Sequence, residues 1–384
     1  MERTALADKI MILGVDGLDP RLTKKFVEEG KMPNTKKFIE RGAQRDDLIL
    51  LGGHPTVTPP MWTTLATGCY ANVHGITSFY RQASDELDAM EYNIDSRLCK
   101  AEQLWNVLAE SGKKTLVWNW PGSAWPPSSD SPNLWVVDGT APGNVGVAKC
   151  RVEEEYILGA NESVTELRYI HKGAFDASAP CMVDEIPDGE FFDLDAHTNP
   201  RQKVYIMKPS EGQGAGGGME IPLDVVKSPI KPATGWVNTP KDAKEFTLLL
   251  GGGYIHRPCL IKKNEAGIYD TVAVYKNKKS IEPIAVLPKG KMVTGIIDEG
   301  MKNSQRYMCN RSLKVMEMAE DGSDVKMYIS TAVDINNDIV WHPQWLHKAV
   351  CENLGYPPPT SYLTAQDVNL NAAMLDCWDD ICSW

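Results

Sequence analysis

Residues 55–68 have the sequence PTVTPPMWTTLATG, and the rest of the chain is organised around this stretch. The apolar side chains of Trp62, Leu65 and Ala66 recur at the spacing of one helix face, so an amphipathic helix is predicted after Pro60. Proline is favoured in the first turn of a helix, because the N–H that it lacks has no partner there. Thr58 is therefore predicted to lie at or next to the N-cap of this helix.

The hydroxyl of Thr58 has two interpretations in this position. In the first, it accepts a hydrogen bond from the first turn and caps the helix. In the second, it is a nucleophile for a phosphorus centre, because free N–H groups and the positive end of the helix dipole attract anions. The stretch by itself leaves both interpretations open.

The composition is that of a globular protein with a sizeable core. The chain has 384 residues, of which 42% are hydrophobic, and this length suggests two or three domains. Its net charge of −11 argues against a nucleic-acid backbone or an anionic membrane as the main partner. A small phosphorylated substrate stays open, because a local metal site can override the field of the whole chain.

The cysteines and the hydrophobic runs indicate a cytoplasmic compartment. Residues 1–9 lack the apolar run of a signal peptide, and no apolar run in the chain approaches the length of a membrane span. The nine cysteines are scattered and odd in number, which is typical of free thiols in a reducing environment. The oligomeric state is left open.

The first 123 residues alternate predicted strands and helices. The strands are predicted at residues 9–15, 48–51 and 115–120, and helices at a stretch through Phe26, at 33–41, after Pro60 and at 101–110. This alternation predicts an α/β fold with a mostly parallel sheet and helices on both faces. Asp16 follows the first strand, where open α/β sheets bind ligands, although an Asp before Gly17 is also common in a simple turn.

The pattern changes near residue 145. Asp321-Gly322 lies between two apolar runs, residues 313–315 and 325–329, which predicts a β-hairpin, and another strand is predicted at 268–275. We therefore predict an N-terminal part of the α/β domain at 1–145, an inserted, largely antiparallel β cap at 146–330, and a return to the first domain at 331–384. Residues 374–384 are predicted to form a helix without a C-cap, which indicates a truncated chain.

Four segments in the first third of the chain carry a resemblance to a known family. They are Gly14-Val15-Asp16-Gly17, Met32-Pro33-Asn34 with Gly42, the stretch 55–76 with Thr67-Gly68 and His74-Gly75-Ile76, and Leu104-Trp105 with Trp120-Pro121-Gly122-Ser123. Their order and spacing resemble the type I phosphodiesterase and nucleotide pyrophosphatase family of the alkaline phosphatase superfamily.

The resemblance implies a fold and a site. It implies an alkaline-phosphatase-like α/β sheet with two divalent metal ions, zinc in the first place and manganese as the alternative. Asp16 matches the family's metal-binding Asp. Thr58 matches the nucleophile that contacts the same metal, because it directly precedes the helix and keeps the spacing to Thr67-Gly68. A threonine is a weak nucleophile until a metal lowers the pKa of its hydroxyl.

The chain also departs from the family pattern. Phe79 stands where nucleotide pyrophosphatases carry an Asn that contacts a phosphate oxygen, and no Asp-His-Gly occurs in the chain. Asp338 and His342 have the spacing of the family's D-x3-H ligands, but they directly follow the predicted cap. The remaining candidates have simpler interpretations as surface or structural residues, and they are His54, His74, Asp195, His197 and Asp334.

These observations support three hypotheses. The first is a metal-dependent phosphodiesterase that acts through a phosphothreonine at Thr58, with Asp16 holding the metal. The second is a phosphomonoesterase or phosphomutase of the same superfamily. The third, from another class, is a catalytically incomplete protein that binds a phosphate ester without turnover, and the missing metal ligands motivate it.

Overall fold

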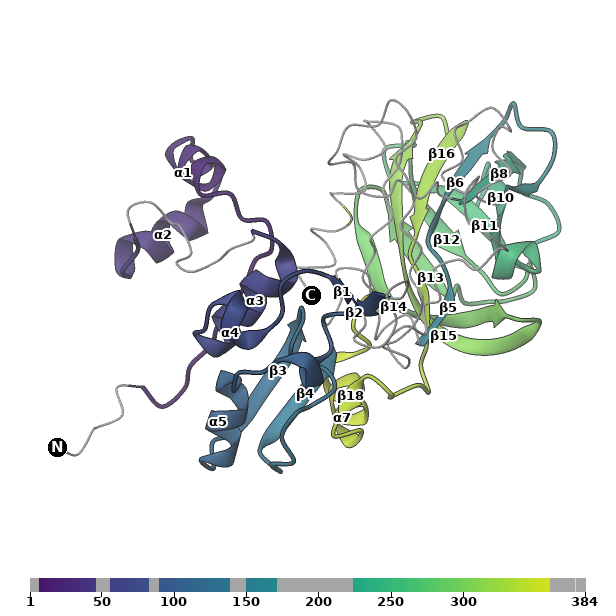
Figure 1. The fold of residues 1–384 in the computed structure, drawn as a ribbon. Coiled ribbons are helices and arrows are strands. Elements are labelled where there is room, and N and C mark those ends of the chain that lie inside the picture. Colours follow the sequence, from purple (N-terminus) through teal and green to yellow (C-terminus); the bar gives the residue numbers. More distant parts are fainter. Residues whose placement is uncertain are drawn as a thin grey trace, which may run out of the picture.

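The computed structural model describes residues 7–45, 56–82, 90–138, 150–170, 224–359 and 377. Figure 1 shows two parts, an N-terminal part of helices with a small sheet and a β-rich body. The helices are α1 (Pro20–Glu28), α2 (Pro33–Arg41), α3 (Thr58–Thr67), α4 (Ala71–His74), α5 (Leu104–Glu110) and α7 (Trp345–Leu354), with 3-10 turns at Ser96–Leu98 and Gly251–Gly253.

Local sequence signals explain where the helices of the N-terminal part begin and end. Asp19 caps α1 by accepting hydrogen bonds from the N–H groups of Arg21 and Leu22. Pro33 occupies the first turn of α2, and Gly42 ends that helix, as predicted. Gly68 ends α3 with a φ of 68°, a left-handed conformation that glycine adopts without strain.

The small sheet of the N-terminal part has three strands in the order β18-β4-β3. They are β3 (Thr115–Trp120), β4 (Leu134–Asp138) and β18 (Trp341–His342). β3 and β4 are parallel, and β18 pairs with β4 in the antiparallel direction. Side chains of α5, such as Trp105 and Ala109, pack with Val117 and Val136, and Leu346 of α7 belongs to a separate cluster with Val137.

The β-rich body consists of two sheets. The first contains β9 (Lys231–Pro232), β10 (Lys244–Leu250), β11 (Ile255–Lys263), β12 (Tyr269–Val274) and β13 (Ala285–Pro288). The second contains β5 (Arg151–Glu153), β6 (Tyr156–Asn161), β7 (Arg168–Ile170), β8 (Asp224–Pro229), β14 (Met292–Lys302), β15 (Gln305–Met318), β16 (Asp324–Ile329) and β17 (Ala332–Asp334). A separate two-stranded sheet pairs β1 (Tyr80–Gln82) with β2 (Met90–Tyr92).

The order of the strands in the first sheet of the body is β13-β12-β11-β10-β9, with every neighbour antiparallel. The order in the second is β5-β17-β15-β16-β6-β8-β7, and β14 pairs with β15. Buried side chains of both sheets, among them Leu248 and Ile261 of the first and Leu313 and Met327 of the second, form one hydrophobic core. This core is the largest in the described residues.

The predicted hairpin and the predicted strand at 268–275 are confirmed. β15 and β16 pair in the antiparallel direction across Asp321-Gly322, and Gly322 has a φ of 67°. β12 covers Tyr269–Val274. A turn glycine and alternating apolar residues therefore identified these elements correctly.

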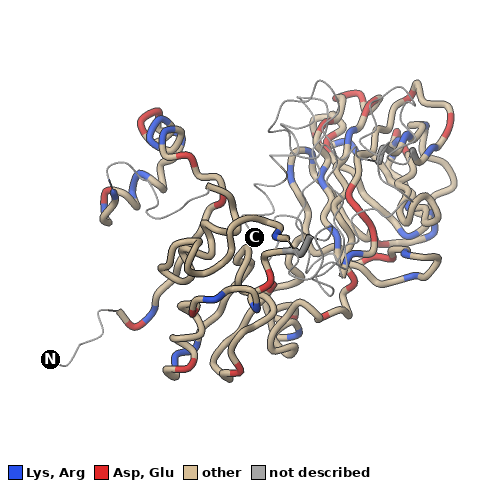
Figure 2. The backbone as a smooth tube through the Cα atoms, viewed as in Figure 1, with Lys and Arg blue, Asp and Glu red and all other residues tan. Residues whose placement is uncertain are grey.

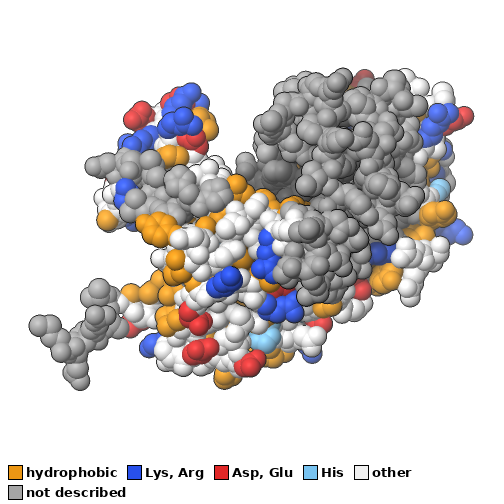
Figure 3. Space-filling view, in the orientation of Figure 1, with side chains coloured by type: hydrophobic (Ala, Val, Ile, Leu, Met, Phe, Trp, Pro, Cys, Tyr) orange, Lys and Arg blue, Asp and Glu red, His pale blue; other side chains and the backbone are white. Residues whose placement is uncertain are grey.

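The predicted fold class, a mostly parallel alkaline-phosphatase-like sheet with helices on both faces, is wrong. The described residues are mostly β, and most strand pairs are antiparallel; among the named strands that the structure describes, the parallel pairs are β3–β4 and β6–β8. The expected central strand at residues 9–15 pairs with no described strand, and Ile10, Met11 and Leu13 are more than four-fifths exposed. Figure 3 shows hydrophobic side chains on the surface beside the N-terminal end.

The physical reason for this error is that an apolar run specifies burial but not a partner. A parallel strand needs neighbours on its edges and cover on both faces, and the described residues supply neither to residues 9–15. The predicted strand at 48–51 lies outside the described residues. Most strands come from residues 151–334 instead, where hairpins join neighbouring antiparallel strands.

The predicted domain boundaries at 145 and 330 stay predictions. β17 lies beyond residue 330 but pairs with β15 of the body. Of the predicted terminal helix at 374–384, the structure describes Cys377 alone. Within the described part of the chain, no helix combines the length and apolar character that a membrane crossing requires.

Candidate active site

Thr58 is the first residue of α3, and Val57 is the N-cap, with extended backbone angles of φ −124° and ψ 149°. Val57 has no side chain that can accept a hydrogen bond, and no described residue hydrogen-bonds to the Thr58 hydroxyl. Thr58 is half-buried. The interpretation of Thr58 as a capping residue therefore does not hold. Its hydroxyl lies at the start of the helix without a hydrogen-bond partner among the described residues.

The start of α3 offers few backbone donors. Pro59 and Pro60 have no N–H, and the N–H of Met61 donates to the carbonyl of Val57 at 3.2 Å. Of the residues from Thr58 to Met61, Thr58 is therefore the one that can offer a backbone N–H to an anion. The dipole of α3 supplies the remaining attraction for the anion.

Asp16 is tied to the same helix through Trp62. The indole Nε1–H of Trp62 donates to Oδ1 of Asp16 at 2.7 Å. Trp62 follows Thr58 by four residues, so the two side chains lie on one side of α3, one turn apart. Asp16 itself lies in the exposed segment before α1. Thr58 thus belongs to the first turn of α3, and Asp16 is hydrogen-bonded to the following turn of the same helix.

A tryptophan cluster joins α3 to the small sheet. The rings of Trp62 and Trp120 pack edge to face with centroids 4.9 Å apart, and Trp105 of α5 lies 5.5 Å from Trp120. The Nε1–H of Trp120 also donates to the carbonyl of Trp62 at 3.3 Å. After β3, Gly122 approaches Pro59, since a Cβ added to this glycine would lie 3.7 Å from the Cα of Pro59. The loop at the carboxyl end of β3 therefore lies against the start of α3.

His74 is structural, as the sequence indicated. It is completely buried, its Nδ1 accepts from the N–H of Ile76 at 3.1 Å, and its Nε2 lies 3.2 Å from the Thr64 hydroxyl. Burial lowers the pKa of His74, although a hydrogen bond to the carbonyl of Pro60 acts in the opposite direction. The neutral ring joins α3 to the loop after α4.

The region around Phe79 contains a residue that sequence reasoning missed. The N–H of Asn93 donates to the carbonyl of Phe79 at 2.7 Å, and its side-chain amide donates to the carbonyl of Ser78 at 3.2 Å. Asn93 is fully buried, and its Oδ1 has no hydrogen-bond partner among the described residues. The next residue, Ile94, lies beside Gly122. The sequence offered one sign of this residue, because Asn93 is a polar residue between the apolar residues 92 and 94.

The site helix is uncharged. Residues 48–80 contain no Lys, Arg, Asp or Glu, and Figure 2 shows α3 and α4 without charged residues. The carboxylate of Asp16 lies next to α3, where it accepts the hydrogen bond from Trp62. Residues 48–80 supply no Lys or Arg side chain for a bound phosphate, and the positive field that this segment offers is the helix dipole.

The residues that could hold a metal here are Asp16 and Thr58. An aspartate carboxylate and a hydroxyl suit a divalent cation, and in the described part of the chain only the Trp62 indole hydrogen-bonds to Asp16. These two donors fit part of a metal site. Across the described ranges, no group of three His, Cys, Asp or Glu side chains is close enough to hold a metal ion, so a complete two-metal centre is not formed there.

Asp338 and His342 do not form a pair, despite their spacing. Burial lowers the pKa of His342, and the opposing charge near it is Asp130. Burial also lowers the pKa of His347, and Asp338 is the opposing charge there. Asp338 accepts a hydrogen bond from the side chain of Gln344 at 3.4 Å. His54, Asp195 and His197 lie outside the described residues, and the Asp334 carboxylate accepts from the N–H of Asn336 in a turn.

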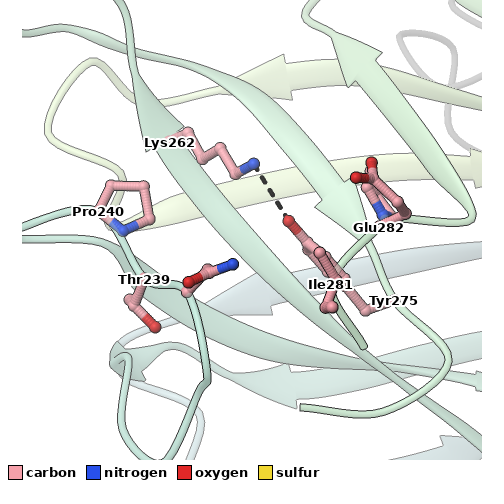
Figure 4. A pocket seen from close by; sticks show the side chains of 8 residues that line it. Thr239, Pro240, Lys262, Tyr275, Ile281 and Glu282 are labelled. Atoms are coloured by element: carbon pink, nitrogen blue, oxygen red, sulfur yellow. Dashed lines mark hydrogen bonds between the residues drawn. The ribbon is translucent and has the colours of Figure 1, made fainter. Parts of the chain in front are cut away.

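A pocket lies in the β-rich body, on the sheet that contains β11 and β12 (Figure 4). Its volume is about 490 Å³, and Nζ of Lys262 donates to the Tyr275 hydroxyl at 3.2 Å on its wall. The lining residues are Asn238, Thr239, Pro240, Lys262, Tyr275, Ile281, Glu282 and Pro283. None of these is a predicted site residue, and Figure 1 places this sheet apart from α3.

The match to a known family includes the residues of α3 and does not reach the residues that line this pocket. Residues 10–177 match the model of the type I phosphodiesterase / nucleotide pyrophosphatase family. Over these residues the chain is similar to that family. The predicted resemblance is thereby confirmed, and the match includes Asp16, Thr58 and the tryptophan cluster. No solved structure matches the chain.

The family match also confirms the predicted enzyme class, a hydrolase that acts on phosphate ester bonds. Members of a phosphodiesterase family act on phosphorylated substrates, and the family is typically metal-dependent. The match ends at residue 177, so the strands from β8 to β18 lie outside the matched residues.

Proposed function

We propose that this chain is a phosphodiesterase in which Thr58 is the nucleophile and Asp16 is a metal ligand. The observation that carries the proposal is the hydrogen bond from Trp62 to Asp16, which links the carboxylate to the helix that begins at Thr58. The family match over both residues supports the same assignment.

The reaction has two displacement steps. In the first, Oγ1 of Thr58 gives up its proton and attacks phosphorus, an Oγ1–P bond forms, the ester P–O bond breaks, and the leaving oxygen takes up a proton. In the second, water attacks the phosphothreonine, and the Oγ1–P bond breaks to release the phosphate monoester and restore the hydroxyl. The Thr58 N–H and the dipole of α3 stabilise the negative charge of the phosphoryl oxygens.

Divalent cations, zinc first and manganese as the alternative, would supply Lewis-acid chemistry that lowers the pKa of the hydroxyl and neutralises phosphate charge. Asp16 and Thr58 would supply some of the ligands of these cations. Asp16 contributes a carboxylate oxygen, and Thr58 contributes the reacting oxygen itself.

A diester suits the site better than a monoester. A phosphate diester carries one negative charge, whereas a monoester carries about 1.5 to 2 at neutral pH. The absence of Lys and Arg from residues 48–80 leaves no side-chain cation of this segment for the second charge. The phosphomonoesterase or phosphomutase alternative requires such a cation from elsewhere in the chain.

The test is hydrolysis of an aryl phosphodiester and of the matching monoester, with zinc and with chelator. Thr58→Ala should lower kcat by at least about a thousandfold, as removal of a nucleophile does in other enzymes. Thr56→Ala is the matched control, because it removes a nearby hydroxyl outside the helix, and it should retain activity. Full activity of Thr58→Ala would contradict the assignment of the nucleophile.

A second candidate function follows from the incomplete metal site in the described residues. In this alternative the chain binds a phosphate ester without hydrolysing it. Isothermal titration with a non-hydrolysable phosphodiester distinguishes the two. Tight binding with no turnover in zinc or manganese would favour the binding protein, and zinc-dependent turnover would exclude it.

A further inference from the structure

Trp62 contacts both halves of the candidate site. Its ring is buried at 8% exposure in α3, and its indole N–H reaches the carboxylate of Asp16 at 2.7 Å. Asp16 lies in a segment whose side chains are exposed from residue 10 to residue 18. Little else in the described part of the chain therefore fixes the position of this carboxylate.

The neighbours of Trp62 hold its ring in one orientation. Trp120 packs against the ring at an interplanar angle of 88°, and its indole N–H donates to the Trp62 carbonyl. On the Asp16 side, a Cβ added to Gly14 would collide with the six-membered ring of Trp62. Glycine at residue 14 thus lets the backbone before Asp16 lie directly on the indole.

From this geometry we propose that Trp62 is a positioning residue, which ties Asp16 to the nucleophile helix through its indole N–H. The bond occupies Oδ1 and leaves Oδ2 of the carboxylate without a hydrogen-bond donor among the described residues. Trp62 lies one helical turn from Thr58, so one rigid element carries the nucleophile and the donor that orients Asp16. The catalytic part of this inference rests on the proposed function.

A phenylalanine at residue 62 separates this role from packing. Trp62→Phe keeps an aromatic ring in the cluster but removes the N–H, so it should release Asp16 while α3 stays folded. Trp105→Phe is the matched control, because it removes an indole N–H from the same cluster at a ring that packs on Trp120 rather than on Asp16. Loss of a residue that orients a metal ligand typically costs 10- to 100-fold in activity.

The hydrogen bond is observed directly in the indole region of a ¹H–¹⁵N spectrum, recorded on the whole chain without added metal. Trp62→Phe identifies the Trp62 signal by its disappearance. Asp16→Ala, a change at an exposed residue, should shift that signal upfield more than any other indole signal. A spectrum in which Asp16→Ala shifts no indole signal would overturn the proposed contact, whether or not Trp62→Phe folds.

The catalytic role is tested by kcat and KM on the aryl phosphodiester. Trp62→Phe should lower kcat by about 10- to 100-fold, and Trp105→Phe should stay close to the native rate. Trp62→Phe should have no further effect in an Asp16→Asn background. Equal losses in both tryptophan variants, or additive losses with Asp16→Asn, would assign Trp62 to packing and overturn the proposal. Full activity of Thr58→Ala would instead remove the proposed nucleophile, while the spectrum would still decide the contact.

Discussion

His74 gives the candidate site a pH dependence that is structural. Its ring is fully buried, Nδ1 accepts a hydrogen bond from Ile76, and burial lowers its pKa from 6.5. The unfolded chain therefore binds more protons than the folded chain below about pH 6.5, and stability falls as the pH drops through this value towards the lower folded pKa. Because His342 and His347 also have lowered pKa values, they act in the same direction.

We predict that His74→Asn reduces this acid sensitivity and destabilises the chain at pH 8. The Asn oxygen can replace the acceptor for Ile76, but the buried Thr64 hydroxyl loses its partner, which costs about 1–3 kcal/mol. Urea unfolding at pH 5.5 and pH 8 measures both effects. His256→Asn, at an exposed residue of β11, is the control, and an unchanged pH slope in His74→Asn would contradict the prediction.

At the residue scale, the sequence predicted identities better than contacts. The position of Thr58 at the start of a helix followed from local spacing, and the structural role of His74 followed from the family resemblance. The partner of Asp16 did not, because Trp62 was assigned to the apolar helix face and its N–H was not considered. Asn93 was missed for a related reason, since its contacts with residues 78 and 79 form only when β1 and β2 pair.

At the element scale, Gly322 determines the turn between β15 and β16. Its φ is 67°, and a Cβ added there would lie 2.9 Å from the ring of Tyr269, whose hydroxyl donates to the carbonyl of Asp242. We predict that Gly322→Ala lowers the free energy of unfolding by about 2–4 kcal/mol, from the left-handed backbone together with the overpacked ring. Urea unfolding measures the loss.

Gly267 provides the matched control for this turn. Its φ is 81°, but nothing lies within 4 Å of an added Cβ. Gly267→Ala should therefore cost only the backbone strain, about 1–2 kcal/mol. A loss in Gly322→Ala no larger than in Gly267→Ala would show that Tyr269 moves aside without cost.

The same elements show why the hairpin was predicted correctly, whereas the prediction of a parallel strand at residues 9–15 was wrong. A hairpin is specified locally, by Asp321-Gly322 and the alternating residues beside it. A parallel strand depends on partners that are distant in sequence. Residues 9–15 have the apolar content of such a strand, but the described residues provide no partner, and the run is exposed.

At the scale of the whole molecule, the two parts differ in how much apolar surface they bury. The β-rich body has a continuous core between two sheets, whereas the N-terminal part has a three-stranded sheet and smaller clusters of buried side chains. The sequence predicted a β-rich region here but not the strand order of either sheet. That order depends on pairings such as β6 with β8, which join residues 156–161 to residues 224–229.

This difference predicts that the N-terminal part unfolds before the β-rich body. Local stability follows buried apolar contact, and Ile10, Met11 and Leu13 contribute little because they are exposed. Hydrogen exchange followed by mass spectrometry across a urea series should expose residues 115–120 at lower urea than residues 246–261, and hydrolysis should be lost with the first transition. α7 should unfold with the first part, although it follows the body in sequence, because Leu346 packs with Val137 and Trp341. Coincident exposure of all these segments would instead show that the chain unfolds as one cooperative unit.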